Sequence, residues 1–173
     1  MCFLMFQRKN ASFWKISLLL YTICIIFLMF FAFGRQSGTP DVALRYSFVI
    51  TGIPLWMPRH FSLLWVFSMG NLLAFAPFGL LLPRAFPTRL HSYSRCLAVF
   101  AAAVIALELM QMLTRLGSFD MEDILVNTWG FSLGFYAVRL SRERPVALAC
   151  WLVVLTVLSI LAAELLNSVF FGR

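Results

Sequence analysis

Several polar residues with chemically useful side chains lie close together between residues 107 and 134, in sequence that is otherwise largely apolar. They are Glu108, Gln111, Arg115, Asp120, Asp123 and Asn127. Glu108 and Asp123 are the candidate catalytic residues, because the proton affinity of a buried carboxylate can be tuned for acid–base chemistry. The other four, together with Asn71 earlier in the chain, are candidate ligand-binding residues. Their amide, guanidinium and carboxylate groups predict a site for a polar ligand.

The composition of the chain indicates that this site lies in a membrane protein. Of 173 residues, 62% are hydrophobic and only 12% are charged, which is too apolar for a soluble domain with a single core. About 20 apolar residues cross a bilayer as a helix, so we predict an all-α, polytopic transmembrane bundle of about five spans. The predicted spans cover residues 13–33, 61–82, 96–113, 120–140 and 145–170.

The same boundaries predict the organisation of the chain. Residues 1–12 form an amino-terminal segment, 13–140 the main membrane domain with an outer loop at 34–60, and 145–170 an additional membrane helix. Within the loop, residues 48–59 are apolar but interrupted by Gly52, Pro54 and Pro58. This stretch is too short to cross the bilayer, so it is either a re-entrant or interfacial segment packed against protein, or an ordinary loop.

The basic residues predict the orientation of the spans. More of them fall on the side of the amino end than on the opposite side, which places the amino end in the cytoplasm and the carboxyl end outside. Those on the first side are Arg8, Lys9, Lys15, Arg84, Arg89, Arg95, Arg139, Arg142 and Arg144, and those on the second are Arg35, Arg45, Arg59, Arg115 and Arg173. Because they lie between apolar runs rather than among aromatics, the net charge of +7 does not indicate nucleic acid binding.

The spacing of the polar residues indicates how they meet. On a helix, Glu108, Gln111 and Arg115 share one face. The following helix has a similar face, formed by Asp120, Asp123, Asn127, Gly130 and Gly134. A tight turn joins the two helices, so the faces converge, with Glu108 and Asn127 about 10 Å below the outer surface at 1.5 Å per residue. We therefore predict a polar pocket that opens to the outer leaflet, with Asn71 as a third wall.

Each of these residues also has a structural explanation. Asp120 has the type and position of a helix N-cap, and Asp123 is a first-turn acid that the helix dipole favours. Asn71, Gln111 and Asn127 are also typical of hydrogen bonds that join membrane helices. The spacing of Gly130 and Gly134 favours close helix packing. Glu108 either pairs with Arg115 or keeps its proton, because an ionised carboxylate is costly in the membrane.

The carboxyl-terminal span has a smaller polar pair of its own. Glu164 and Asn167 are three residues apart near the predicted outer end of this helix. They either extend the pocket or, as we expect, lie at a terminal surface. The cysteines have neither metal nor disulfide spacing, and we predict no bound metal.

The motif residues together resemble those of VanZ-like membrane proteins, a family named for resistance to the glycopeptide teicoplanin. The resemblance covers roughly residues 65–140 and includes Asn71, Phe75, Pro77, Gly79, Pro83, Glu108, Gln111, Arg115, Asp120, Asp123, Asn127, Gly130 and Gly134. It implies a small multi-helix membrane protein. It carries over the motif positions but assigns no catalytic role to any of them.

Three functional hypotheses follow. In the first, the protein binds or processes a cell-envelope amphiphile, a lipid-linked cell-wall precursor or a glycolipid, in a bacterial cytoplasmic membrane, and so contributes to glycopeptide resistance. In the second, it is an enzyme acting on a lipid headgroup, with Glu108 as acid or base, Arg115 holding a phosphate, and Asp120 with Asp123 positioning a hydroxyl or Mg²⁺. In the third, the polar residues only join helices in a structural or assembly partner. The sequence names no particular cofactor.

Overall fold

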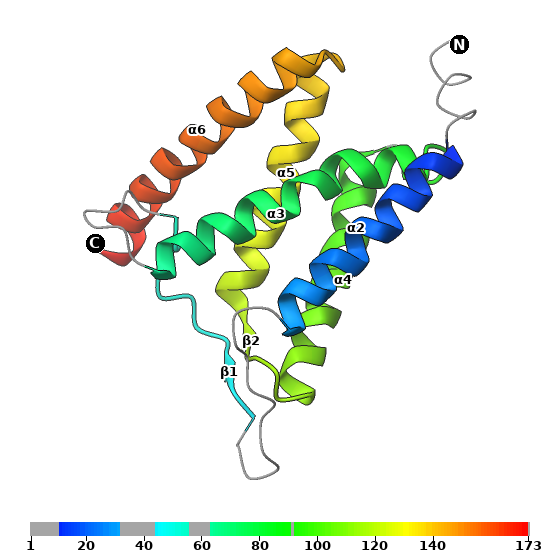
Figure 1. Ribbon diagram of the computed structural model, residues 1–173. Helices are drawn as coiled ribbons and strands as arrows, with labels where there is room; N and C mark the ends of the chain where they lie inside the picture. Colours follow the sequence, from blue (N-terminus) through cyan, green and yellow to red (C-terminus); the bar gives the residue numbers. More distant parts are fainter. Residues whose placement is uncertain (1–10, 32–43, 56–62, 91, 173) are drawn as a thin grey trace. The chain divides into compact units, whose positions relative to one another are not determined.

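The computed structural model describes residues 11–31, 44–55, 63–90 and 92–172. This part of the chain contains five helices and two short strands (Figure 1). In order they are α2 (Ala11–Phe31), β1 (Tyr46–Ser47), α3 (Leu63–Ala85), α4 (Tyr93–Leu113), β2 (Phe119–Asp120), α5 (Met121–Ser141) and α6 (Pro145–Phe171). The amino-terminal segment up to residue 10 and most of the predicted outer loop lie outside the described residues.

The helices confirm the predicted all-α, polytopic membrane fold. Four of them, α2, α3, α4 and α6, are long and apolar enough to cross a membrane, judged by length and composition within the described residues. Helix α5 has the same length as α2 and α4 but carries Glu122, Asp123 and Arg139. The helix boundaries differ from the predicted spans by no more than three residues, so the apolar runs located the helices well.

The chain forms two compact units. Unit one consists of residues 1–47 and 80–120, and unit two of residues 48–79 and 121–173. Helix α3 therefore contributes its first part to unit two and its last residues to unit one. Each unit has its own buried side chains and its own polar contacts.

In unit one, α4 packs along a face that repeats at helical spacing. Its buried residues are Cys96, Phe100, Val104, Glu108 and Gln111. The side-chain Nε2 of Gln111 donates a hydrogen bond to the backbone oxygen of Met29 on α2, at 2.9 Å. At the other end of α2, the guanidinium of Arg84 lies 4.9 Å from the ring centre of Trp14, a cation–π contact. Helix α2 is thus held at both ends.

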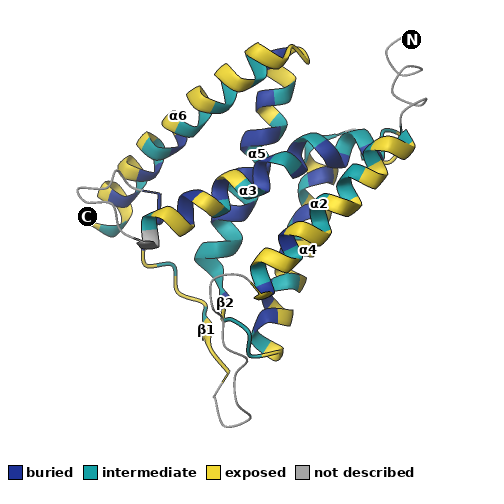
Figure 2. Ribbon diagram, viewed as in Figure 1, coloured by how far each residue is buried: buried dark blue, intermediate teal, exposed yellow. Residues whose placement is uncertain are grey.

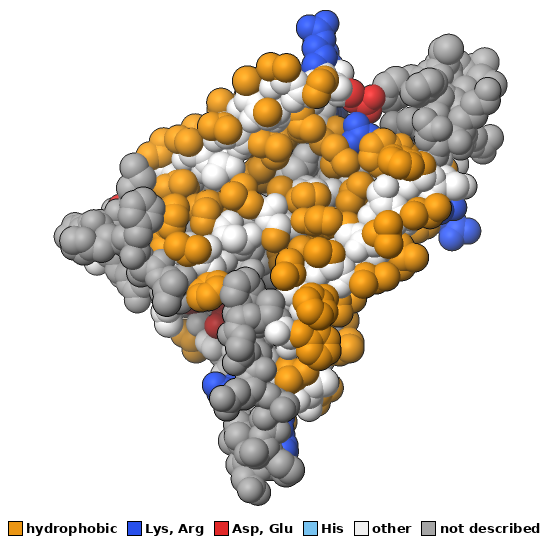
Figure 3. Space-filling view, in the orientation of Figure 1, with side chains coloured by type: hydrophobic (Ala, Val, Ile, Leu, Met, Phe, Trp, Pro, Cys, Tyr) orange, Lys and Arg blue, Asp and Glu red, His pale blue; other side chains and the backbone are white. Residues whose placement is uncertain are grey.

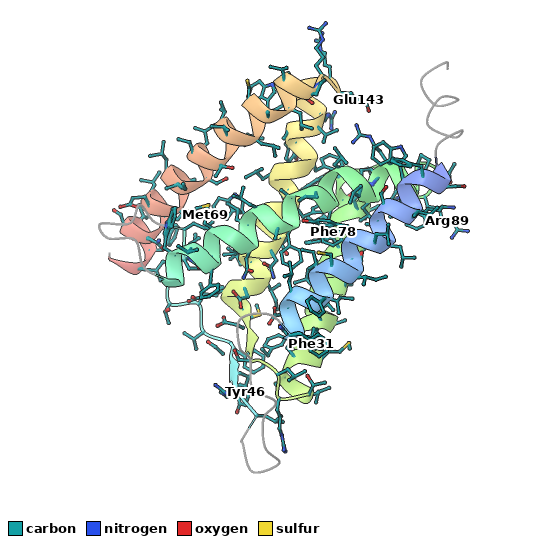
Figure 4. The ribbon with its side chains drawn as sticks, in the orientation of Figure 1. Phe31, Tyr46, Met69, Phe78, Arg89 and Glu143 are labelled. Atoms are coloured by element: carbon teal, nitrogen blue, oxygen red, sulfur yellow. The ribbon has the colours of Figure 1, made fainter. Side chains whose placement is uncertain are left out.

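Two short strands complete unit one. Strands β1 and β2 pair in parallel, with Tyr46 opposite Phe119 and Ser47 opposite Asp120 (Tyr46 is labelled in Figure 4). The backbone N–H of Phe119 also donates to the oxygen of Arg45, at 3.1 Å. The sequence did not predict this ladder, because a pairing of two residues leaves no alternating pattern to recognise.

In unit two, α3, α5 and α6 surround an apolar core. Its buried residues are Ile53, Leu55, Met69, Leu72, Ala76, Val126, Leu133 and Ala163. Helices α5 and α6 are joined by a tight turn in which Arg142 and Glu143 have φ angles of 49° and 66°. Pro145 then occupies the first turn of α6, where a missing backbone N–H costs nothing. The burial pattern shows mixed exposure along α6 and mostly buried or intermediate positions along α5 (Figure 2).

Glycines bring α3 and α5 of unit two into backbone contact. A Cβ atom added to Gly130 would meet the backbone oxygen of Leu72, and one added to Gly134 would meet that of Ala76. From the α3 side, a Cβ on Gly79 would meet backbone atoms of Phe131 and Phe135. These contacts are closer than real Cβ atoms ever come. The prediction that Gly130 and Gly134 serve close helix packing is therefore confirmed.

Side chains from two helices hold the segment of residues 48–55. The backbone N–H and the hydroxyl of Thr51 both donate to Oε1 of Glu122 on α5, at 2.7 and 2.9 Å. On α6, Oδ1 of Asn167 accepts from the N–H of Ile53 at 2.7 Å, and its Nδ2 donates to the Ile53 oxygen at 2.9 Å. Residues 52–55 are buried, so the segment packs against protein. Residues 56–59 of this predicted segment lie outside the described residues, and its depth in the membrane stays a prediction.

Candidate functional site

Asn71 of α3 and Asp123 of α5 meet within unit two. The amide Nδ2 of Asn71 donates to the carboxylate Oδ1 of Asp123 across 3.4 Å, and both residues are only partly buried. The glycine contacts farther along the same two helices explain why these short side chains can reach one another. The structure therefore brings together two of the predicted site residues that lie far apart in the sequence.

One helical turn beyond Asp123, Asn127 is completely buried. Its exposed fraction is 0%, and within the described part of the chain neither its Nδ2 nor its Oδ1 has a hydrogen-bond partner. The hydroxyl of the next residue, Thr128, is also buried and unbonded there. A buried polar group without a partner costs about 1 to 3 kcal/mol. Among the described residues of this unit, Asn127 thus has two buried polar atoms without a hydrogen-bond partner, and Thr128 has one.

We refer to Asn71, Asp123 and Asn127 as the amide–carboxylate site. Asp123 and Asn127 are four residues apart on α5 and so lie on one face, with Asn71 donating to the first of them. An asparagine side chain offers donors on nitrogen and an acceptor on oxygen, and an ionised carboxylate only accepts. Together they match a group that both donates and accepts hydrogen bonds, such as a hydroxyl or an amide.

Glu108 and Gln111 belong to unit one, where both are buried on α4. Glu108 is 1% exposed and Gln111 is 3% exposed. Because Gln111 donates to the backbone of α2, the structure gives it the interhelical role that was its structural alternative. Glu108 continues the buried face formed by Phe100 and Val104. Its predicted catalytic role and that of Asp123 stay predictions.

Two of the predicted site residues lie outside helices α4 and α5. Arg115 was predicted to continue the helical face of Glu108 and Gln111, but α4 ends at Leu113 and Arg115 has a φ angle of 60° in the turn that follows. Asp120 has two interpretations, a helical face shared with Asp123 or the N-cap of the helix. It lies in β2, immediately before α5 begins at Met121, which is the position that the N-cap interpretation gives it. Both residues lie in the stretch that joins α4, which ends at Leu113, to α5, which begins at Met121.

The residues of the predicted pocket belong to two different units of the chain. Unit one contains Glu108, Gln111, Arg115 and Asp120, and unit two contains Asn71, Asp123 and Asn127. Their joining into one outward-facing pocket stays a prediction. Among the described residues, no group of three or more histidine, cysteine, aspartate or glutamate side chains is arranged to hold a metal ion.

Two residues that the sequence does not identify as site residues organise unit two. Asn167 was expected at a terminal surface, but it is 3% exposed and bonds both backbone groups of Ile53. Glu122 was not singled out, although it accepts two hydrogen bonds from Thr51. Both partners lie on the segment of residues 48–55, far away in the sequence. The one signal for Asn167 is its spacing of three residues from Glu164 within an apolar span.

Comparison with known families agrees with the motif residues. A family model described as VanZ/LLP1 matches residues 18–142, which is more than half of the chain and more than the roughly 65–140 that the motif covered. No curated protein and no solved structure matches the chain. The chain therefore belongs to the VanZ/LLP1 family, and its apolar helices make it a multi-pass membrane protein.

Proposed function

We propose that this VanZ/LLP1-family membrane protein binds the polar headgroup of a cell-envelope amphiphile at the amide–carboxylate site. The amphiphile is a glycolipid or a lipid-linked cell-wall precursor of the bacterial cytoplasmic membrane. Binding such a molecule, or shielding it, is the route by which the protein would contribute to resistance against teicoplanin-type glycopeptides.

The burial of Asn127 carries this proposal. Its amide nitrogen and oxygen are both enclosed, and within the described residues neither has a hydrogen-bond partner. An apolar side chain of similar size would avoid that cost at an interface already packed by glycines. The presence of asparagine there is accounted for by a ligand that supplies the missing partners.

The neighbouring groups support a headgroup rather than a lipid tail as the ligand. Asp123 and Asn71 are partly exposed one turn away, so the site runs from an accessible carboxylate to a buried amide. A sugar hydroxyl or a peptide amide satisfies both Asn127 atoms, because each of these groups donates as well as accepts. A fully ionised phosphate only accepts, and it would be repelled by the Asp123 carboxylate.

The test is native mass spectrometry of gently solubilised protein from membranes, comparing wild type with Asn127→Leu. Wild type is expected to retain an envelope amphiphile. Loss of the hydrogen bonds to one side chain should weaken retention about tenfold in Asn127→Leu, without lowering thermal stability. Asp123→Asn should weaken it less, because an amide can still accept from the ligand.

Thr156→Val on α6 is the matched control. Its hydroxyl donates within its own helix, to the oxygen of Leu152 at 2.7 Å, so the loss of a polar group there should leave retention unchanged. Equal retention by wild type and Asn127→Leu would overturn the proposal. Mass analysis of the retained lipid against that from cells lacking the protein also separates binding from processing, because only processing changes the mass.

A further inference from the structure

A second site lies on the other side of α5 in unit two, between α5 and α6. A hollow of about 390 Å³ is lined by Trp129, Ser132, Leu133, Tyr136 and Leu140 of α5 and by Leu155 and Ser159 of α6. This volume lies within the usual range of small-molecule sites. It shares no residue with the amide–carboxylate site.

The hollow offers an almost entirely apolar wall. The indole N–H of Trp129 donates to the hydroxyl of Ser159 at 3.0 Å, and that hydroxyl donates to the Leu155 oxygen at 2.7 Å. The hydroxyl of Ser132 donates to the Thr128 oxygen at 2.8 Å. Because the donors of Trp129, Ser132 and Ser159 already have hydrogen-bond partners, they need no polar ligand. The hollow therefore suits a hydrocarbon chain.

Its position along the helices suits a lipid of one leaflet. From Trp129 to Leu140 the hollow follows α5 for about 16 Å at 1.5 Å per residue. That is about half of the 30 Å hydrocarbon core of a bilayer. Helix α6, which forms the other wall, is long and apolar enough to span the membrane, and hydrophobic side chains cover its outer side (Figure 3). The molecules that surround such a hollow are lipid chains.

The end of the hollow is strongly basic. Leu140 lies next to Arg139, and the turn that follows carries Arg142 and Arg144 with a single acid, Glu143. All four charged side chains are exposed, and basic atoms are visible at this end of α5 and α6 (Figure 3; Glu143 is labelled in Figure 4). Arg142 and Glu143 adopt positive φ angles, a conformation that favours glycine, yet both positions carry charged side chains.

From the hollow and the arginines together we infer that this surface binds an anionic phospholipid. One acyl chain occupies the hollow between α5 and α6, and the phosphate headgroup lies against Arg139, Arg142 and Arg144. The charge distribution of the sequence predicts that this turn is cytoplasmic, and the cytoplasmic leaflet is where anionic lipids attract basic residues. The site is independent of the amide–carboxylate site.

The experiment uses the full chain purified in detergent and exposed to equal amounts of phosphatidylglycerol and phosphatidylcholine with identical acyl chains. Native mass spectrometry then measures which lipid the protein retains. Wild type is expected to prefer phosphatidylglycerol. Each of Arg139→Gln, Arg142→Gln and Arg144→Gln should lower that preference about fivefold, whereas Glu143→Gln should raise it.

A second pair of variants tests the hollow itself. Leu140→Trp places a large ring at its edge, and Val154→Trp places the same ring on α6 outside the lining, at a position of similar exposure (45% against 44%). Leu140→Trp should lower retention of both lipids at least threefold, and Val154→Trp should leave it unchanged. Asn127→Leu should also leave it unchanged, so failure here is distinguishable from failure of the proposed function.

Two results would overturn the inference. One is equal retention of phosphatidylglycerol and phosphatidylcholine by wild type, which would mean that only unselective surrounding lipid is present. The other is equal behaviour of Leu140→Trp and Val154→Trp, which would mean that the hollow holds no chain. If an arginine variant fails to fold, the tryptophan pair still decides the matter.

Discussion

Helix α5 uses two different kinds of interface within unit two. Against α3 it presents Gly130 and Gly134, whose missing side chains allow backbone contact with Leu72 and Ala76. Against α6 it presents Trp129, Leu133 and Tyr136, and these leave a hollow of about 390 Å³. One interface is closed by small residues, and the other is held apart by large ones.

The two interfaces of α5 also differ in whether their polar side chains have hydrogen-bond partners. At the α5–α6 interface, the indole N–H of Trp129 donates to the hydroxyl of Ser159, and that hydroxyl donates to the Leu155 oxygen of its own helix. At the α3–α5 interface, Asn71 reaches Asp123, but the buried Asn127 has no hydrogen-bond partner within the described residues. The close α3–α5 interface therefore leaves Asn127 unsatisfied within the described residues, while the α5–α6 interface pairs Trp129 with Ser159 and leaves apolar space. We propose a headgroup for the first interface and an acyl chain for the second.

The largest effect is expected from Gly134→Ala at the closed interface. The new Cβ would meet the Ala76 carbonyl group, coming within 2.6 Å of its carbon, and both partners are helix backbone that cannot rotate away. We expect a loss of about 3 kcal/mol or more in the free energy of unfolding, measured by thermal unfolding in detergent. Gly70→Ala on α3 is the control.

At Gly70, an added Cβ would meet nothing within 4 Å. Alanine is the better helix former by about 0.5 to 1 kcal/mol, so Gly70→Ala should be neutral or stabilising. Equal stability of the two alanine variants would show that the backbone contact of α3 with α5 does not hold in the detergent-solubilised protein.

The next largest effect is expected in the segment of residues 48–55, which Glu122 of α5 and Asn167 of α6 bind through hydrogen bonds. Asn167→Leu removes the acceptor of the buried Ile53 N–H, which should cost about 2 kcal/mol. Thermal unfolding should show this loss, and hydrogen exchange at residues 51–55 should rise. Glu164→Gln, one turn earlier on α6 and exposed, should change neither. Unchanged exchange in Asn167→Leu would mean that other contacts hold the segment.

These residues show what the sequence was able to predict. Apolar runs of about 20 residues located the helices of the described residues, because the cost of placing unsatisfied backbone and charge in a bilayer makes that pattern strict. The spacing of Gly130 and Gly134 predicted close packing for a similarly local reason. Both signals lie within one helix and need no knowledge of the partner.

The contacts that were missed depend on partners distant in the sequence. Asn167 bonds the backbone of Ile53, and a backbone group has no residue type by which sequence could identify it. Arg115 does not continue the face of Glu108 and Gln111, because α4 ends at Leu113, where the apolar run predicts its end, and the backbone turns at Arg115. Periodicity therefore identified Glu108, Gln111 and Asn127 as buried polar residues, but neither the partner of Gln111 nor the burial of Asn167.

The third prediction is a gain in stability rather than a loss. Asn127→Leu should raise the free energy of unfolding by about 1 kcal/mol in protein stripped of bound lipid, because a buried amide without partners is replaced by an apolar chain. Asn71→Leu should lower it slightly, since that change removes the hydrogen bond to Asp123. Thermal unfolding after extensive detergent exchange measures both. A marked loss of stability in Asn127→Leu would place the partner of Asn127 within the protein itself and remove the argument for a ligand.

The smallest effect tests the hydrogen bond at the more open interface. A double-mutant cycle with Trp129→Phe and Ser159→Ala isolates the interaction between the indole N–H and the hydroxyl. Hydrogen bonds between membrane helices contribute about 0.6 kcal/mol on average, so a coupling of that size is expected in thermal unfolding. The cycle should be unaffected by Gly70→Ala, which lies on α3. A coupling near zero would mean that the indole prefers lipid or water to Ser159, and the α5–α6 hollow would then lose its apolar character, because an unbonded donor would face into it.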